Sequence, residues 1–368
     1  MPRQLSPRQT SVEESENEKS LRPHNIAEYV GQTDIVENLR VFIKAASQRR
    51  EPLDHILLSG PPGLGKTTLA QLVASEMGVE MRATSGPAIS RPIDLLVLLH
   101  GLRPRQVLFI DEIHRLSHVV EEILYPVMED LSFDRIISKG NSKGAIQHRV
   151  APFTLVGATT RSGALSAPLR SRFGILMQLN FYTLDELAKI VRRSASLLDI
   201  SIDKGGSLEI ARRCRGTPRI ANRLIKRVRD FAQVEGEKQI TAEIAAYALE
   251  RMSIDSCGLD SIDRRILDIL INTYKGQPVG LTTLAAAIGE EPDNLEDVYE
   301  PYLLASGFLL KTPRGRVAGP KAYEHLGLEP FPAAGLIGLN FDRNQFGMVR
   351  NFVYDEVKAR HISVASPA

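Results

Sequence analysis

The sequence has few cysteines and no long apolar run, and each absence excludes a class of protein. Its two cysteines, Cys214 and Cys257, lie far apart and lack the spacing of metal ligands. This argues against a zinc site and a disulfide framework, and it fits a reducing compartment. No apolar run reaches the roughly 18 residues of a membrane span, and the N-terminal residues lack the apolar core of a signal peptide. We therefore expect a cytoplasmic protein without a membrane contact.

The chain also has almost no net charge. It carries 46 Lys and Arg against 44 Asp and Glu, which gives a formal net charge of +2. Such a balance produces no general basic field, so any contact with nucleic acid has to come from a local patch. A length of 368 residues is sufficient for two or three domains.

Short apolar runs alternate with amphipathic stretches in the first half of the chain. The periodicity predicts helices over about 33–48 and 66–77, and strands over 55–59, 81–84, 107–110, 153–158 and 175–179. The run at 107–110 is almost continuously apolar, which is typical of a parallel strand covered on both faces. Alternating strands and helices favour a layered α/β sheet. β-rich arms around a Gly/Asn/Ser centre predict a protruding hairpin at 131–150.

The second half of the chain is organised differently. From 183 to about 250 the pattern is helical without a strand signal, which predicts a small helical domain. A polar segment at 253–260 separates this domain from a third unit, in which three short helical patterns precede a hairpin around Thr312–Gly315. Helices followed by such a hairpin indicate a winged helix. Residues 1–20 are polar and predict a disordered tail, and a further helix is expected near 344–359.

The segment from Gly60 to Thr67, GPPGLGKT, satisfies the P-loop pattern G-x-x-x-x-G-K-[ST] between an expected strand and an expected helix. Its glycines let backbone N–H groups turn towards phosphate, and the helix N-terminus adds partial positive charge there. Lys66 is expected to reach the β- and γ-phosphates, and the Thr67 hydroxyl to bind Mg²⁺. The segment therefore predicts an ATP site with Mg²⁺.

Polar residues follow two of the other expected strands. Asp111 and Glu112 end the run at 107–110, where one acid can hold the shell of Mg²⁺ and the next can deprotonate water. Thr159 and Thr160 follow the strand at 153–158, and they fit either a contact with the γ-phosphate or a simple strand end. Combined with the P-loop, the acid pair indicates nucleotide hydrolysis.

Arg170 and Arg172 lie just before the last expected strand. They fit ordinary surface charge, and they also fit an arginine finger that acts on the nucleotide of a neighbouring subunit. Such a finger contributes about 10³–10⁵ in rate. The residues alone leave both interpretations open.

Further segments of the chain complete a series with a fixed order and spacing. The series comprises Leu21–Pro23, Glu28–Gln32, Gly60–Thr67, Asp111–His114, Tyr125–Asp130, Gly157–Arg161, Leu169–Gly174, Gly216–Arg219 and Thr312–Arg316. Together these segments resemble the RuvB family from about Leu21 to Leu328. The resemblance implies an α/β P-loop AAA+ core with a small all-helical lid domain and a C-terminal winged-helix domain. We expect the core over 21–182, the lid over 183–254 and the winged helix over 255–330, between the tail over 1–20 and an extension over 331–368.

The resemblance also implies a function. RuvB proteins are ATP-dependent motors that drive branch migration of Holliday junctions in homologous recombination and DNA repair. They form hexameric rings around duplex DNA, bind the junction-specific protein RuvA, and work before a resolvase, RuvC. We therefore expect a homohexamer that hydrolyses ATP and acts on junction arms of any sequence with a RuvA-type partner.

Individual roles are carried over from the family to matching positions. Lys66 and Thr67 bind phosphate and Mg²⁺, Asp111 directs Mg²⁺, and Glu112 is the general base. Thr159 matches the sensor at the fourth strand, Arg172 the arginine finger, and Arg219 the second sensor in the lid. The remaining nucleotide contacts that the resemblance implies are Leu21, Arg22, Tyr29, Val30, Gly63, Leu64, Gly65, Thr68, Glu129, Asp130, Leu131, Tyr182 and Pro218.

The expected DNA contact lies on the wing of the winged helix. Lys311, Arg314 and Arg316 form a cationic hairpin, which Lys321 extends, and such a hairpin can follow phosphates without reading bases. Two segments depart from the family pattern. Glu291–Asp293 stands where family members often carry Arg, and the hairpin at 132–150, which usually docks RuvA, is more polar and basic here.

Other AAA+ proteins share part of this pattern. A clamp-loader-like switch has the P-loop, sensors and finger, but it would favour a helical collar over a winged helix. An unfoldase would carry an aromatic-hydrophobic pore loop, for which the sequence shows no clear candidate. A non-enzymatic DNA-binding regulator would not need Lys66, Asp111 and Glu112 together.

Overall fold

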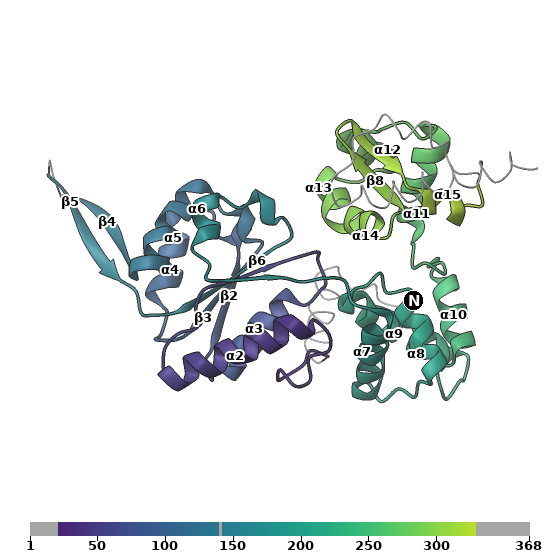
Figure 1. Cartoon of the computed structure of the whole chain (residues 1–368), viewed down its shortest axis with the longest axis horizontal. Coiled ribbons are helices and arrows are strands. Elements are labelled where there is room, and N and C mark those ends of the chain that lie inside the picture. Colours follow the sequence, from purple (N-terminus) through teal and green to yellow (C-terminus); the bar gives the residue numbers. More distant parts are fainter. Residues whose placement is uncertain (1–20, 140–141, 329–368) are drawn as a thin grey trace, which may run out of the picture. The chain divides into compact units, whose positions relative to one another are not determined.

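A five-stranded parallel sheet forms the centre of the α/β core in the computed structural model (Figure 1). The strand order is β2 (Met81–Ser85), β3 (Val107–Asp111), β6 (Thr154–Thr159), β1 (Ile56–Ser59) and β7 (Ile175–Gln178). The structure describes residues 21–139 and 142–328, so the predicted N-terminal tail and the helix predicted near 344–359 lie outside the described residues. The chain divides into two compact units, Met1–Ala245 and Ala246–Ala368.

Helices connect the parallel strands, because a parallel pair needs a crossover rather than a tight turn. The sequence predicted the helix that precedes the first strand and the first connecting helix, but not the next three. The segments of the core are α2 (Thr33–Arg49), α3 (Lys66–Glu76), α4 (Pro92–His100), α5 (His118–Asp130), α6 (Ala167–Ser171) and the short turns η1 (Gly86–Ala88), η2 (Ile113–Arg115) and η3 (Ser162–Ala164). Leu108, Ile110 and Leu155 of the sheet pack with Leu124 and Val127 of α5 in a core cluster whose members are almost fully buried. Helix-covered strands of this kind read as continuous apolar runs.

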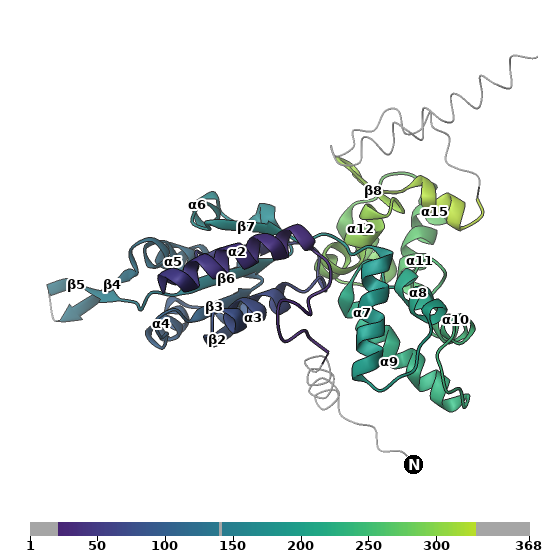
Figure 2. The same ribbon diagram turned by 60° about the horizontal axis from the view of Figure 1, so that its bottom comes forward.

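The predicted hairpin is present. Strands β4 (Ser132–Lys139) and β5 (Ser142–Arg149) pair antiparallel and extend away from the sheet in both ribbon views (Figures 1 and 2). At its base, the rings of Phe133 and His148 stack with centroids 5.4 Å apart. His148 also contacts the ring of His100 in α4, with centroids 5.6 Å apart, so the base of the hairpin packs against the core.

The helical segment comprises α7 (Leu184–Leu197), α8 (Lys204–Arg212), α9 (Pro218–Val234) and α10 (Ala242–Arg251). Thr183 begins α7 with a capping box, in which its hydroxyl accepts from the Glu186 N–H and the Glu186 carboxylate accepts from the Thr183 N–H. Pro218 opens α9, where its fixed φ and missing N–H cost nothing. Gly216, at φ 68°, makes the turn before α9, and a Cβ there would lie 2.8 Å from Phe181. The turn at Gly216 and the proline at 218 thus set the direction of the first turn of α9.

Two tyrosines join the P-loop to the start of the helical segment. The Tyr29 hydroxyl lies 2.8 Å from the Tyr182 hydroxyl, which donates to the Leu64 carbonyl at 3.1 Å. Arg193 of α7 donates to the Leu21 carbonyl at 2.7 Å and pairs with Glu28 at 2.8 Å. The N-terminal segment, the P-loop and α7 therefore share one hydrogen-bonded frame.

The second unit has the predicted helices and hairpin. Its segments are α11 (Ser261–Asp268), η4 (Ile269–Thr273), α12 (Leu281–Ile288), α13 (Pro292–Asn294), η5 (Leu295–Tyr299), α14 (Glu300–Ala305), β8 (Leu309–Thr312), β9 (Gly315–Ala318) and α15 (Pro320–His325). The third predicted helix is a run of three segments with a π-helical turn, η5, in its middle. Val279 and Arg316 exchange backbone hydrogen bonds, which gives the hairpin a third, one-residue partner. A Cβ at Gly315 would lie 2.3 Å from the Val279 carbonyl oxygen, so the approach requires glycine.

A buried ion pair joins the wing to α14. Arg316 is 7% exposed and Glu300 is 1% exposed. The guanidinium Nε and Nη2 atoms donate to the two Glu300 carboxylate oxygens, the latter at 3.0 Å, and Nη2 also lies 3.6 Å from Glu296. Such a two-pronged pair orients both side chains, and the loss of either partner leaves a buried charge.

Among the described helices, none combines the length and the apolar character that a membrane crossing requires.

Glu300→Ala is expected to destabilise the winged helix, because it leaves the Arg316 guanidinium buried without its carboxylate. The expected loss is about 3–5 kcal/mol in the free energy of unfolding. Hydrogen exchange of the β8 and β9 amides in the full chain, followed against urea concentration, measures it. Replacing both residues by apolar ones is expected to cost less than the single change, and equal protection in Glu300→Ala and the parent would contradict the role of the pair.

Tyr182→Phe is expected to remove a phenol that has an unusually high pKa. Burial raises the pKa of Tyr182 from 10.0 to about 12. Because the folded pKa is raised, the stability contribution is full below the unfolded pKa near 10 and is lost as pH rises through about 12. The difference in phenolate absorbance between the parent chain and Tyr182→Phe should therefore have its midpoint near pH 12. A midpoint near 10 would place this hydroxyl in water.

Candidate nucleotide site

The P-loop is held in a conformation that only glycine adopts easily. Gly60, Gly63 and Gly65 have φ values of 139°, 81° and 100°. A Cβ at Gly60 would lie 2.6 Å from the Leu179 carbonyl oxygen, and one at Gly65 would lie 3.1 Å from the Tyr29 hydroxyl. The loop ends at Lys66, the first residue of α3, so its backbone N–H groups and the helix N-terminus lie together. This arrangement binds phosphate.

Lys66 lies inside the loop rather than in solvent. Its ammonium donates to the Gly60 carbonyl at 2.7 Å and to the Pro61 carbonyl at 3.0 Å, and the residue is 7% exposed. Burial lowers the pKa of Lys66, and the nearby carboxylates of Glu112 and Asp111 partly offset this. The cation is therefore fixed in direction between the loop and the acid pair.

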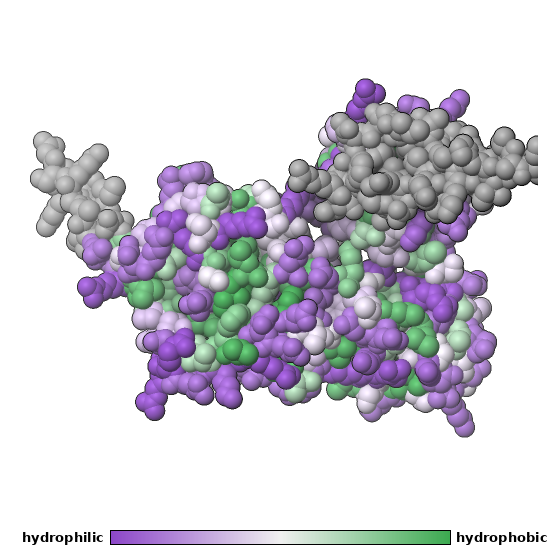
Figure 3. Space-filling view, viewed as in Figure 1, coloured by the Kyte–Doolittle hydropathy of each residue, from purple (hydrophilic) through white to green (hydrophobic). Residues whose placement is uncertain are grey.

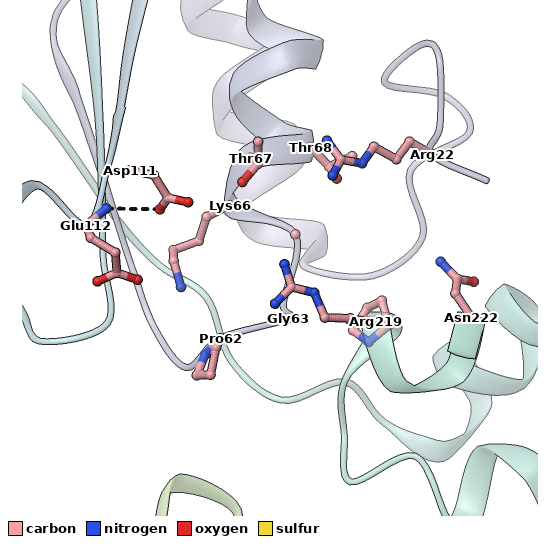
Figure 4. A pocket seen from close by; sticks show the side chains of 12 residues that line it. Arg22, Pro62, Gly63, Lys66, Thr67, Thr68, Asp111, Glu112, Arg219 and Asn222 are labelled. Carbon is pink, nitrogen blue, oxygen red and sulfur yellow. Dashed lines mark hydrogen bonds between the residues drawn. The ribbon is translucent and has the colours of Figure 1, made fainter. Parts of the chain in front are cut away.

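A single cavity collects the P-loop, the acid pair and the start of α9 (Figure 4). Figure 4 shows Lys66, Thr67, Asp111 and Glu112 towards one end, and Arg22 and Asn222 towards the other. The residues that line the cavity are Arg22, Pro62, Gly63, Gly65, Lys66, Thr67, Thr68, Asp111, Glu112, Pro218, Arg219 and Asn222. Phosphate-binding groups at one end leave the other end for the nucleoside.

The acid pair is well ordered by its own backbone. The Asp111 carboxylate accepts from the Glu112 N–H at 3.0 Å. Glu112 has φ 48°, a left-handed conformation that is uncommon for a residue with a side chain. A Cβ on Gly86 of η1 would lie 2.4 Å from the Glu112 carbonyl oxygen, so glycine is needed beside this turn. Strained backbone of this kind is typical of functional sites.

Thr160, rather than Thr159, contacts the predicted base. The Thr160 hydroxyl donates to the Glu112 carboxylate at 3.2 Å. Thr159 is fully buried, and its hydroxyl bonds to His114 at 2.9 Å and accepts from the Arg161 N–H at 3.0 Å. His114 Nδ1 also lies 3.3 Å from Glu112. The sequence offered the Thr159–Thr160 pair but no signal for which hydroxyl faces the acid.

The lid side of the cavity contains one residue that sequence reasoning missed. The Arg219 N–H donates to the Gly63 carbonyl at 3.3 Å, which joins α9 to the P-loop. Asn222, one turn further along α9, also lines the cavity, and its amide oxygen accepts from the Ser194 hydroxyl at 2.6 Å. Its spacing of three residues from Arg219 was the available signal, because such residues share a helix face.

The remaining predicted nucleotide contacts lie outside this cavity lining. Leu21 is 2% exposed, and Leu64, Tyr29 and Tyr182 belong to the frame behind the loop. Val30 is half-buried beside that frame. Glu129, Asp130 and Leu131 end α5, and Arg172 ends α6 with its guanidinium paired to Glu129 at 3.2 Å. Glu129, Asp130, Leu131 and Arg172 do not line the described cavity.

A magnesium ion fits the donors that the cavity presents. The Thr67 hydroxyl and the Asp111 carboxylate are hard oxygen ligands of the kind that Mg²⁺ prefers. No group of three or more His, Cys, Asp or Glu side chains with metal-binding geometry occurs among the described residues. The remaining ligands of Mg²⁺ would thus be phosphate and water, as is usual in P-loop sites.

The cations predicted to form the DNA-binding patch differ in their exposure. Arg314 lies exposed in the turn between β8 and β9, and Lys321 is exposed on α15. Lys311 pairs with Glu296 at 3.2 Å and is 44% exposed. Arg316 belongs to the buried pair with Glu300 and does not present its guanidinium at the surface. The structure therefore places only part of the predicted DNA-binding patch on the outside.

Comparison with protein families gives three consecutive matches. The chain matches the P-loop domain of the Holliday junction DNA helicase RuvB over residues 21–179. It matches the RuvB AAA lid domain over 182–255 and the RuvB C-terminal winged-helix domain over 256–327. The three matches follow one another along nearly the whole described chain.

Solved structures of RuvB proteins are also similar to this chain. The Holliday junction branch migration motor RuvB of Thermotoga maritima is 50% identical, with a TM-score of 0.78, and the match covers 84% of this chain and 99% of that chain. Two point mutants of the Thermotoga maritima protein match over the same shares, with TM-scores of 0.79 and 0.77 at 50% and 49% identity. With its P-loop ATPase core, helical lid and winged helix, this chain belongs to the RuvB family.

Proposed function

We propose that the chain is the motor that drives branch migration of Holliday junctions, with ATP hydrolysis in the described cavity as its energy source. One observation carries the proposal most directly. The cavity contains a P-loop, an acid pair and an arginine from the helical lid, so hydrolysis and lid position share one site. A ligand that contacts two bodies differently before and after hydrolysis shifts their relative arrangement.

Within the cavity we assign the roles as follows. Lys66 binds the β- and γ-phosphates, and Thr67 and Asp111 hold Mg²⁺, which neutralises charge on the phosphates. Glu112 accepts a proton from the attacking water. Thr160 orients the Glu112 carboxylate through its 3.2 Å hydrogen bond, and Thr159 keeps the predicted role of sensor at the fourth strand. Arg219 reports the γ-phosphate to α9.

Other contacts act from the frame and from a neighbour. The N-terminal segment with Leu21, Arg22, Tyr29 and Val30, together with Tyr182 and Pro218, encloses the nucleoside end. Arg172, with Glu129, Asp130 and Leu131, is separate from its own cavity, which fits action on the nucleotide of the next subunit in a homohexamer. The apolar side chains Val97, Val119 and Leu176 are exposed on the core and suit burial between subunits. Figure 3 shows hydrophobic residues at the surface of the core in one view.

We propose three working parts with divisions near 182 and 254. The core over 21–182 hydrolyses ATP, the lid over 183–254 senses it, and the winged helix over 255–330 holds DNA. Arg314 and Lys311, extended by Lys321, contact phosphates, while Arg316 supports the wing from inside. Contacts of this kind are independent of sequence, which suits movement along any DNA arm.

The hairpin β4–β5 is proposed to dock a RuvA-type protein, and a RuvC-type resolvase would act after branch migration. The antiparallel arms of the hairpin extend away from the core (Figure 1), which makes them accessible to a partner.

The test uses synthetic four-way junctions with Mg²⁺ and ATP, with and without the cognate RuvA-type protein. Branch migration is expected to depend on ATP and to increase with the partner. Glu112→Gln should bind ATP but lower the ATPase turnover by about 10²–10⁴, because only proton transfer to the base is lost. Strand separation on a gel and phosphate release measure the two activities. ATP turnover without junction movement would move the function to a loader-like switch, and unchanged turnover in Glu112→Gln would remove Glu112 as the base.

Arg314→Ala and Arg316→Ala are expected to weaken DNA binding for different reasons. Loss of one phosphate contact at Arg314 should reduce the slope of log affinity against log salt by about 0.9, equally for unrelated duplex sequences. Hydrogen exchange in β8 and β9 should stay unchanged in that variant and become faster in Arg316→Ala. An unchanged salt slope in Arg314→Ala would exclude this side chain from the contact.

A further inference from the structure

Arg172 is held on three sides, although it lies at the surface end of α6. Nη1 donates to the Pro168 carbonyl at 2.7 Å, and Nη2 donates to the Glu129 carboxylate at 3.2 Å. The guanidinium carbon lies 4.6 Å from the centre of the Tyr125 ring, which is a cation–π contact. Only 20% of the side chain is exposed. A long cationic side chain is thus confined to one direction.

One face of α5 provides this hold and also fixes the far end of α6. Glu121, Tyr125 and Glu129 follow one another at a spacing of four residues, so they lie along one helix face. The buried Glu121 carboxylate accepts from the Tyr125 hydroxyl at 3.1 Å and from the Ser166 hydroxyl at 2.6 Å. Ser166 is the N-cap of α6 and accepts from the Leu169 N–H. The same face of α5 therefore contacts both caps of α6, Ser166 at the N-terminal end and Arg172 at the C-terminal end.

The ring of Tyr125 cannot turn away from Arg172 without breaking these bonds. Its hydroxyl lies 3.1 Å from Ser166 as well as 3.1 Å from Glu121. Burial raises the pKa of the Tyr125 phenol, so the hydroxyl keeps its proton and remains a donor to Glu121. Glu129 differs in character, because it is 55% exposed. An exposed ion pair is weak, so a triphosphate can replace this carboxylate while the ring stays in place.

We propose that Tyr125 is a positioning residue for Arg172: its ring directs the Arg172 guanidinium towards the nucleotide of the neighbouring subunit. Glu129 pairs with the guanidinium until a phosphate of that nucleotide replaces the carboxylate. The inference rests on the proposed function, because it requires Arg172 to act between subunits. Fixing the side chain beforehand lowers the entropy lost when the finger meets the phosphate.

Mixed assemblies of full-length subunits test this proposal, because substitutions at Tyr125 and Glu129 are made in one subunit and hydrolysis is measured in the unchanged cavity of the other. Lys66→Ala subunits serve as donors with an intact finger and an inactive cavity. Arg172→Ala subunits serve as acceptors with an intact cavity and no finger. Mixing the two should restore part of the ATPase. Donors that also carry Tyr125→Leu should restore about 3- to 30-fold less ATPase activity, because the cation–π contact is lost. This loss should be measured as a lower kcat of the acceptor.

Three further donors sharpen the comparison. Tyr125→Phe keeps the ring but removes both hydroxyl bonds, so its recovery should fall between those of the parent and Leu donors. Glu129→Gln should lower recovery by up to about 5-fold. Glu122→Gln is its matched control, since it removes an exposed acid from the same helix that pairs with His118 instead. It should match the parent donor.

The outcomes distinguish the role of Tyr125 from the action of Arg172 between subunits. Recovery with the parent donor and equal recovery with the Leu and Phe donors would overturn the role of Tyr125 and leave the finger between subunits intact. No recovery with any donor would overturn both. Thermal unfolding and sedimentation of each donor establish folding and assembly. Should the Leu donor fail to fold, the Phe donor decides: lower recovery supports the inference and equal recovery overturns it.

Discussion

The parallel pairing of β6 between β1 and β3 is the constraint on which the nucleotide site depends. Ser59 of β1 pairs with Thr159 of β6, and Ile110 of β3 pairs with Gly157. Because the three strands run in the same direction, their carboxyl ends meet at one edge of the sheet, where ligands of open α/β folds bind. The P-loop, the acid pair and Thr160 each follow one of these ends. Groups that are about a hundred residues apart thereby become neighbours in one cavity.

The connection between the P-loop and the helical segment depends on the same edge. The Gly63 carbonyl accepts from the Arg219 N–H, and the Leu64 carbonyl accepts from the Tyr182 hydroxyl. Both bonds leave the backbone N–H groups of the loop available for phosphate. The loop is thus the common support of the nucleotide and of α9, so a change at the γ-phosphate has a short path to the helices that follow.

Charge on the wing is local, although the chain as a whole is nearly neutral. The net charge of +2 provides no general field, and Arg316 is neutralised by Glu300 within the domain. Arg314 remains in a narrow exposed turn, where a cation can approach a phosphate closely. The buried pair keeps β9 against α14 and so holds that turn in place. Arg316, which the sequence predicted as a DNA contact, therefore supports the turn that carries Arg314.

Residue patterns were sufficient to predict the P-loop, the acid pair, the alternation of strands and helices, the hairpin and the three-part order of the chain. These features are local, since they follow from residue spacing, glycine at positive φ and apolar periodicity within one segment. Tertiary structure decided what depends on direction and burial. It placed the Thr160 hydroxyl against Glu112 and the Thr159 hydroxyl against His114, added Asn222 to the cavity lining, turned Arg316 inward and set Arg172 against Tyr125. Each of these outcomes depends on which distant segment faces a side chain, and a pattern within one segment carries no information about that.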